Sequence, residues 1–369
     1  MDYAQEYVAT LHDLTDPTPE APLAESAVVV PIAGTNPADV RAEHVFETLA
    51  SVRPASVVVP LRAPEQTVYA FEQWVERFDL PVTVLWCNAE SVDATLARHG
   101  LAGESGKGRD VWLGLGVAAS QAKYVAVHDA DATTYSESHV PRLLAPLQGE
   151  YEFVKGYYAR VEDQQLYGRL TRLFVVPLLQ ALSDQHDTEI LRYLSAFRYP
   201  LAGEFALTSE AATHIRAQRT WGLELGVLGD AHAIAGRKHS AQVDLGVHRH
   251  DHRPVEGRAG LSTMADEVGN ALFRVLTDNG LDLDYEALQN TYHDAAMRLV
   301  DQYAADASFN GLSYDPEAER EQVSVYASSI EPPGVDTRLP PWNQVDLSPA
   351  TVLGASHEAT AGTTQVSTD

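Results

Sequence analysis

Cysteine is almost absent from the chain, because Cys87 is the only one among 369 residues. A single thiol excludes a disulfide framework and any zinc site built from several cysteines. No run approaches 18 uninterrupted apolar residues, which argues against a transmembrane helix. The acidic N-terminus also lacks the basic and then apolar layout of a signal peptide. These absences predict a soluble, cytoplasmic protein.

Positive charge is scarce as well. The chain has 26 Lys and Arg against 52 Asp and Glu, a formal net charge of −26, and only four of the cations are lysines. Phosphate contacts need clustered Lys and Arg, so this composition argues against nucleic acid or an anionic membrane as a partner. An acidic, lysine-poor surface is typical of proteins from salt-loving archaea, where salt screens the repulsion. The alternative is an acidic protein from a mesophile.

The pattern of apolar residues predicts an α/β fold. Short β-branched runs at 27–32, 56–61, 82–87 and 124–128 alternate with helix-like segments at 37–51, 65–78 and 110–120. Such nearly continuous apolar strands indicate a mostly parallel sheet with helices on both faces. No G-x-G-x-x-G follows the first strand, which disfavours a Rossmann dehydrogenase.

We expect five segments along the chain. Residues 1–25 read as a polar N-terminal arm, and 26–150 and 151–262 as the two halves of the α/β domain. The second half is expected to hold strands at 151–160, 199–208 and 241–250 and helices at 165–182 and 221–236. Residues 263–330 form a C-terminal helical region with helices at 262–277 and 285–305. Residues 331–369, rich in Pro, Ser and Thr, are expected to be a flexible tail.

Two carboxylates, Asp129 and Asp131, stand where the apolar strand 124–128 ends. Extended spacing places both on one side of the chain, as hard oxygen ligands for Mg²⁺ or Mn²⁺ beside a diphosphate. Parallel sheets bind ligands beyond the carboxyl ends of their strands. The alternative is a solvated turn.

A glycine-rich loop with Lys107 between Gly106 and Gly108 opens onto an apolar helix. It can present the lysine to a nucleotide beside the N–H groups of the helix start. It is not a P-loop, because Gly108 stands where that motif needs Ser or Thr. The alternative is an ordinary glycine-rich turn.

Three histidines, His248, His250 and His252, alternate at the end of a predicted strand and share one face if the strand continues. A neutral imidazole is a good ligand for a divalent metal, although an exposed polar edge is the plainer interpretation. Glu224 and Glu204 sit in apolar, glycine-bearing segments, so each is either paired, a helix cap or functional.

Arg169 and Arg172 are helical neighbours in a basic turn that also holds Thr171. At a helix start, this group is a candidate anion site. The alternative is an intrahelical salt bridge from the arginines to Glu162 or Asp163.

In this order the motifs resemble the GT-A-fold glucosyl-3-phosphoglycerate synthases, which are retaining glycosyltransferases. The resemblance covers about residues 26–265 and rests on five motifs besides the aspartates: Gly106-Lys107-Gly108, Gly168-Arg169-x-Thr171, Gly203-Glu204-Phe205, Gly222-x-Glu224-x-Gly226-x-Leu228 and Asp244-Leu-Gly-Val-x-x-His250. It implies a GT-A fold, a Rossmann-like mostly parallel sheet with flanking helices, followed by a C-terminal helical extension.

The resemblance also implies residue roles. Asp131 and His250 would hold Mg²⁺ or Mn²⁺, while Asp129 completes the aspartate motif at the donor sugar or ribose. Lys107 and Pro31 would contact the nucleotide, and Glu224, with Asp131, would serve as a catalytic residue. The remaining motif would receive the phosphate and carboxylate of 3-phosphoglycerate through Gly168, Arg169 and Thr171.

The chain departs from the family at its first strand, where Gly34 and Asn36 replace the acidic motif that contacts the base. Both UDP-glucose and GDP-glucose therefore remain possible donors. After His250 the chain has Asp251 in place of the family's basic or amide residues. Alternatives are a mannosyl donor, another phosphorylated acceptor, or a nucleotide-sugar-binding protein without catalysis. Apolar stripes in the C-terminal helices predict packing against the core or against a second subunit, and together with the resemblance they suggest a homodimer.

Overall fold

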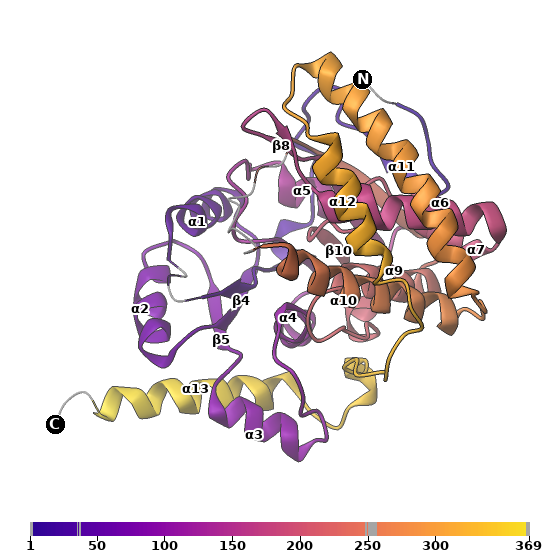
Figure 1. Cartoon of the computed structure of the whole chain (residues 1–369). Coiled ribbons are helices and arrows are strands. Elements are labelled where there is room, and N and C mark those ends of the chain that lie inside the picture. The colour runs from indigo at the N-terminus through magenta and orange to yellow at the C-terminus, as the bar shows by residue number, and fades with distance from the viewer. Residues whose placement is uncertain (1–2, 35, 37, 248, 250–256, 367–369) are drawn as a thin grey trace.

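The computed structural model describes residues 3–34, 36, 38–247, 249 and 257–366 (Figure 1). In this part of the chain nine strands form one mixed sheet. Its hydrogen-bonded order is β1 (Ala9–Leu11), β11 (Ser240–Val247), β7 (Phe153–Ala159), β10 (Phe205–Thr208), β6 (Tyr124–Val127), β2 (Ser26–Val29), β4 (Ser56–Arg62) and β3 (Ile32–Ala33), with β5 (Val82–Trp86) also paired to β4.

Parallel pairing dominates this sheet, as the apolar runs predicted. Only β10 runs antiparallel to its neighbours β6 and β7, while β2 pairs in parallel with both β4 and β6. Val28 of β2, for example, lies between Val57 and Ala126, and all three are fully buried. The carboxyl ends of β2, β4, β6 and β7 therefore meet at one edge of the sheet, where α/β proteins bind ligands.

The helices of the first half confirm the expected alternation and add two that were not expected. They are α1 (Val40–Val52), α2 (Glu65–Val75), α3 (Glu90–Arg98), α4 (Lys107–Gln121) and α5 (His139–Leu144). Asp39 starts α1 by accepting hydrogen bonds from the N–H groups of Arg41 and Ala42, both at 3.0 Å. The expected helix list lacked α3 and α5, which have only nine and six residues.

The second half differs from expectation at the predicted helix 165–182. Its first two residues form β9 (Gln165–Leu166), which pairs in a small hairpin with β8 (Val161–Glu162), because Asp163 and Gln164 adopt left-handed φ angles of 46° and 56°. A π-helical turn, Thr171–Val175, then leads into α6 (Val176–Gln185). The next elements are α7 (Glu189–Ser195), α8 (Ser209–Thr213) and α9 (Leu223–Ile234).

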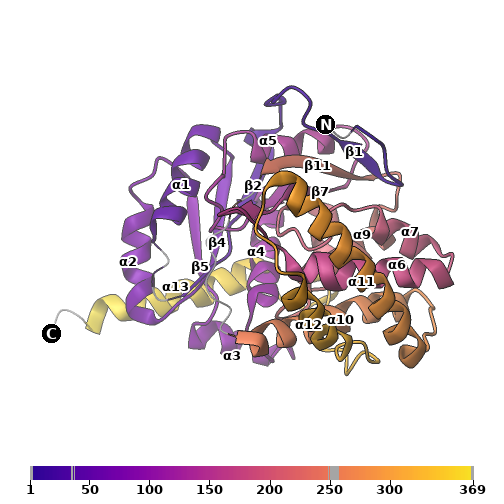
Figure 2. The same cartoon turned by 45° about the horizontal axis from the view of Figure 1, so that its top comes forward.

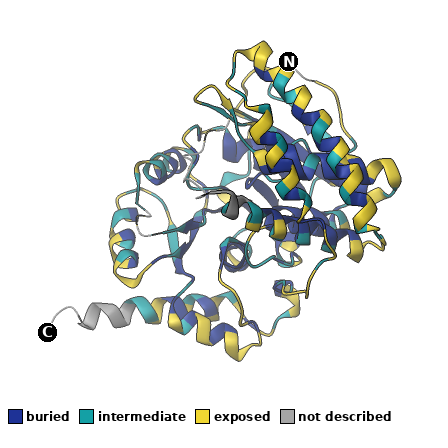
Figure 3. Cartoon of the chain, viewed as in Figure 1, coloured by how far each residue is buried: buried dark blue, intermediate teal, exposed yellow. Residues whose placement is uncertain are grey.

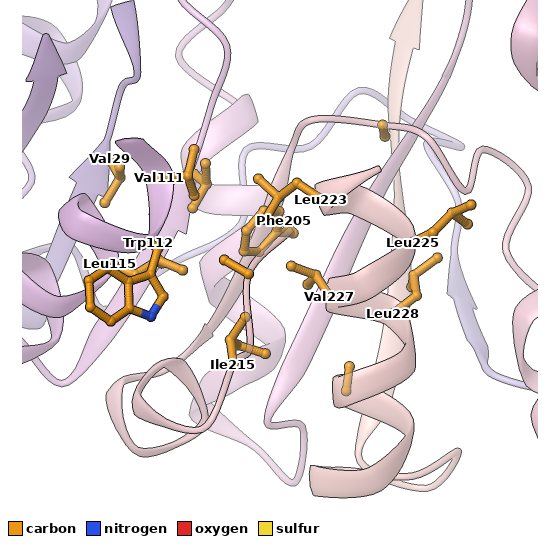
Figure 4. Packing of buried hydrophobic residues seen from close by; sticks show 14 of the residues in the cluster. Val29, Val111, Trp112, Leu115, Phe205, Ile215, Leu223, Leu225, Val227 and Leu228 are labelled. Carbon is orange, nitrogen blue, oxygen red and sulfur yellow. The ribbon is translucent and has the colours of Figure 1, made fainter. Parts of the chain in front are cut away.

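Helices α4 and α9 bury apolar side chains toward each other and toward β10. Figure 4 shows Val111 and Trp112 of α4 on one side of Phe205 and Leu223 of α9 on the other. Each of these side chains is at most 2% exposed. Full burial of such a residue is worth roughly 1.5–3 kcal/mol. This packing holds the starts of α4 and α9 close together at the ligand edge of the sheet.

The C-terminal helical region consists of α10 (Gly257–Asp278), α11 (Tyr285–Asn310) and α12 (Pro316–Ala327). Helix α10 packs on α9, α11 packs on α6, and α12 packs on α11. The outward faces of α11 and α12 are exposed, whereas the sheet strands are buried (Figure 3). None of the helices in the described ranges combines the length and the apolar character needed to cross a membrane.

The segment expected to be a flexible tail instead packs on the first half of the chain. The Trp342 ring stacks on Trp112 at 4.1 Å between centroids, and each indole N–H donates to a backbone carbonyl of the other segment. Helix α13 (Pro349–Val366) then lies alongside α3 (Figure 1). The Pro, Ser and Thr content indicated a flexible segment, although several of its residues, among them Trp342 and Val352, are buried.

The N-terminal arm also belongs to the sheet. Residues 9–11 form β1, which pairs in parallel with β11 at one edge (Figure 2). No helix occurs among residues 3–22. Three residues with alternating burial are too short a pattern to separate a strand from a linker.

Candidate active site

A cleft of about 790 Å³ opens where β2, β4, β6 and β7 end, within the size range of small-molecule sites. Most of the residues that the motifs singled out line it: Pro31, Lys107, Asp129, Asp131, Gly168, Thr171 and Glu224. Arg169, Arg172 and Glu204 are not among the lining residues, and His248, His250 and His252 lie outside the described residues.

An ion-paired group occupies the floor of the cleft. The Lys107 ammonium lies 2.8 Å from Asp129 Oδ1 and 3.2 Å from Glu224 Oε1. Burial alone disfavours the charged ammonium, but Asp129 and Glu224 raise the pKa of Lys107 well above its usual range. The three residues come from three elements, the start of α4, the end of β6 and the start of α9. Lys107 therefore stays protonated and holds both carboxylates in place.

The local sequence explains why Glu224 can stand there. Gly222 has a left-handed φ of 87°, and its Cβ position would meet the side chain of Ala271 at 2.7 Å. This glycine turns the chain into α9, so Glu224 falls in the first turn, where the helix dipole favours an anion. Of the alternatives for this carboxylate, the structure shows pairing, with a lysine as the partner.

Below the floor lies a second lysine that sequence reasoning missed. Lys155 of β7 is 1% exposed, and its ammonium donates to the carbonyl of Ala202 at 2.5 Å. Burial lowers the pKa of Lys155 to about 8, against the opposing pull of Glu224 and Glu204. Glu204 itself is 1% exposed. A cation inside an otherwise apolar strand was the available signal for this buried charge group.

Asp131 is the described part of the expected metal site. Its carboxylate reaches the cleft directly beyond β6, and carboxylate oxygen is the donor type that Mg²⁺ and Mn²⁺ prefer. Residues 3–34, 36, 38–247, 249 and 257–366 contain no group of three or more His, Cys, Asp and Glu side chains arranged to hold a metal. The carboxylate chemistry of Asp131 fits a divalent ion.

The Gly168 turn, residues 168–171, forms one wall of the cleft. Gly168 has a left-handed φ of 74°, and its Cβ position would lie 2.6 Å from the Tyr199 hydroxyl, so only glycine fits. Thr171 is buried at this wall. The turn precedes the π-helical segment, so its N–H groups are those of a helix start.

The two arginines near this turn share one counter-ion, Glu319 of α12. Arg172 pairs with both carboxylate oxygens at 2.9 Å, and Arg169 Nε lies 3.5 Å from Oε1. The alternative pairing within a helix, to Glu162 or Asp163, is wrong because those two residues belong to the β8–β9 hairpin. A partner 147 residues away along the chain cannot be inferred from local spacing.

The lining residues that were not singled out include Arg62, Arg160 and Glu267. Arg62 ends β4 and donates to Asp110 at 2.7 Å. Glu267 of α10 accepts from the Trp221 N–H at 2.8 Å and from the Thr220 hydroxyl. The C-terminal helical region thus contributes directly to the cleft.

Comparison with known proteins gives a consistent picture. No protein-family model matches the chain. Glucosyl-3-phosphoglycerate synthase from Methanococcoides burtonii is 34% identical over 368 residues, covering 92% of this chain and 91% of that protein. The synthase of the same name from Persephonella marina is 34% identical over 286 residues, covering 73% and 71% of the two chains.

Solved structures share the fold. Glucosyl-3-phosphoglycerate synthase from Mycobacterium tuberculosis, crystallised with Mn²⁺, UDP-glucose and phosphoglyceric acid, superposes with a TM-score of 0.56 over 73% of this chain and 88% of that one, at 24% identity. Its complex with Mg²⁺ and UDP gives 0.55 over 73% and 86%, again at 24% identity. The expected GT-A fold is confirmed. The chain belongs to the glucosyl-3-phosphoglycerate synthase family.

Proposed function

We propose that this protein transfers glucose from a nucleotide-diphosphate donor to 3-phosphoglycerate with retention of anomeric configuration. The observation that carries the proposal is the ion-paired group of Asp129, Lys107 and Glu224 on the floor of a cleft at the strand ends. It is supported by family membership and by the UDP-glucose and phosphoglyceric acid in the complex of the Mycobacterium tuberculosis relative.

The donor half of the cleft lies over β2, β4 and β6. Pro31 beyond β2 and Lys107 at the start of α4 line the cleft and would contact the nucleotide. Asp131, with His250, would hold Mg²⁺ or Mn²⁺, which supplies positive charge to the departing diphosphate when it is bound. Lys107 contacts both oxygens of Asp129, and this carboxylate would face the donor sugar or ribose.

The acceptor half is the wall formed by the Gly168 turn. Thr171 and the N–H groups of the helix start suit an anionic group such as phosphate. Arg169 can reach the same group only by turning its guanidinium from Glu319 toward the cleft. Its half-exposed side chain leaves room for that movement.

The reaction itself forms one bond and breaks one on the same face of the sugar. The acceptor hydroxyl oxygen bonds to the anomeric carbon, the bond from that carbon to the phosphate oxygen breaks, and the hydroxyl proton passes to the departing phosphate. Glu224 and Asp129 are both held by Lys107, so neither is placed as a covalent nucleophile. Glu224 orients the sugar or acceptor at the reaction centre.

A product screen tests the proposal. Purified protein in molar KCl with Mg²⁺ or Mn²⁺ is given UDP-glucose, GDP-glucose, UDP-mannose or GDP-mannose, each with 3-phosphoglycerate, and products are read by mass spectrometry. A glycosylated phosphoglycerate that is lost in Asp131→Ala and kept in the exposed control Asp187→Asn is expected. Donor hydrolysis or binding without that product would move the search to other acceptors, or to a protein that binds nucleotide sugars without catalysis.

Three finer properties belong to the same proposal. The net charge of −26 suits a protein that works at high salt, and added KCl should then raise its free energy of unfolding. A homodimer located in the cytoplasm completes the proposal. A monomer mass by light scattering in molar KCl would contradict the homodimer. A free energy of unfolding that falls as KCl is added would contradict the adaptation to high salt.

A further inference from the structure

Arg160 stands beside the Gly168 turn although the sequence separates the two. It follows the last residue of β7, and its carbonyl accepts a 3.0 Å hydrogen bond from the Tyr167 N–H. That bond closes the β8–β9 hairpin and brings the chain back to where the strand ended. Arg160 and Gly168 therefore line the same wall of the cleft.

Tyr199 joins these two residues. Its phenol lies close enough to the Arg160 guanidinium to interact with it electrostatically, and its hydroxyl occupies the space where a side chain on residue 168 would stand. Burial disfavours the charged guanidinium, but Tyr199, Tyr158 and Asp131 together raise the pKa of Arg160. The guanidinium is thus a permanent charge held between the Gly168 turn and Asp131.

The other cations near the cleft are already committed. Lys107 is paired with Asp129 and Glu224, Arg62 with Asp110, and Arg41 with Asp39. Within the described ranges, Arg160 forms no ion pair with a carboxylate at 4.0 Å or less, and its charge remains for a ligand. Arg169, by contrast, contacts Glu319 outside the cleft lining.

We propose that Arg160 binds the carboxylate of the acceptor, while the Gly168 turn and Arg169 take its phosphate. The inference rests on the proposed function, in which the acceptor is 3-phosphoglycerate. In that molecule the carboxylate carbon is bonded directly to the carbon that bears the reacting hydroxyl, and the phosphate is further away. Arg160 lies on the side of Asp131, hence of the reaction centre, and a planar guanidinium suits bidentate binding of a carboxylate.

Two ligands that differ only at the carboxylate provide the test. Binding of 3-phosphoglycerate and of glycerol 3-phosphate, which has a hydroxymethyl group instead, is measured calorimetrically with UDP and Mg²⁺ present. Arg160→Gln should weaken 3-phosphoglycerate by about 10- to 100-fold, as expected for a lost charge-assisted hydrogen bond, and leave glycerol 3-phosphate unchanged. Arg169→Gln, the matched control, should weaken both ligands alike.

Other results would overturn the assignment. If Arg160→Gln weakens the binding of both ligands equally, Arg160 binds the phosphate of the acceptor. If it weakens UDP-glucose binding and leaves the affinity for the acceptor unchanged, Arg160 binds the donor. Tyr199→Phe, which keeps the ring, should show a smaller loss of affinity, and only for 3-phosphoglycerate. This second variant tests the assignment even if Arg160→Gln fails to fold. Wild-type turnover of 3-phosphoglycerate tests the proposed function separately, and its absence together with absent binding would overturn both.

Discussion

Replacing Glu319 by glutamine removes the charge that holds two arginines behind the Gly168 turn. Glu319 is 4% exposed and Arg172 is 7% exposed, so their two 2.9 Å contacts are shielded from water. Breaking one side of such a buried pair leaves an uncompensated charge and costs about 3–5 kcal/mol. Because Gln has nearly the volume of Glu, the cost comes from charge and not from a cavity.

The same change should reach the acceptor. Arg172 also donates to the carbonyls of Tyr167 and Leu166, the two residues before the Gly168 turn. Once the guanidinium loses Glu319, these backbone contacts loosen, so the KM for the acceptor should rise severalfold while the KM for the donor stays unchanged. The change is purely local to the wall that receives the acceptor.

Denaturant unfolding at fixed KCl and steady-state kinetics measure the two effects. Glu317→Gln on the same helix is the control, because its pair with Arg320 is exposed and such pairs contribute little. A loss of stability in Glu319→Gln no larger than in the control would refute the reasoning about burial. A lower acceptor KM would instead mean that Glu319 competes with the acceptor for Arg169.

Three more perturbations have expected outcomes. Lys107→Met should lower kcat by about 10²- to 10³-fold, as measured by product formation, because Asp129 and Glu224 lose their shared cation; an unchanged kcat would contradict this. Lys155 binds its proton less tightly in the folded protein, with a pKa of about 8 against 10.5, so the unfolded chain holds more protons between pH 8 and 10.5. The free energy of unfolding should therefore rise with pH in this range by about 3 kcal/mol relative to Lys155→Met. Parallel pH profiles of the two proteins would contradict this pKa for Lys155. Trp342→Ala should cost about 3–5 kcal/mol of unfolding free energy and expose α13 to proteolysis, and an unchanged digestion pattern would argue against the packing seen here.

Local pattern predicted the parts of the molecule that are set locally. The strands near 56–61 and 124–128 are apolar on both faces and short, which is enough to identify buried parallel strands, and Asp129 and Asp131 follow from the end of the second one. The glycine loop before α4 also placed Lys107 correctly at a helix start. These features need only neighbours within about ten residues.

What remained hidden depends on contacts between distant segments. The meeting of Lys107 with Glu224 spans 117 residues, and the pairing of Arg172 with Glu319 spans 147. Arg160 gave no signal because an arginine after a strand is ordinary until the hairpin brings it to the Gly168 turn. The segment after residue 331 failed for a related reason, since one buried tryptophan outweighs a Pro- and Thr-rich composition.

The most direct test of the central claim is a proton NMR spectrum of the reaction mixture of wild-type protein, UDP-glucose, 3-phosphoglycerate and Mg²⁺ in molar KCl. We expect a new α-anomeric doublet from a glucosyl group that is attached to the hydroxyl next to the carboxylate. This signal should grow as UDP is released. A β-anomeric signal would contradict retention and attack from the same face. Release of UDP with only free glucose would contradict 3-phosphoglycerate as the acceptor.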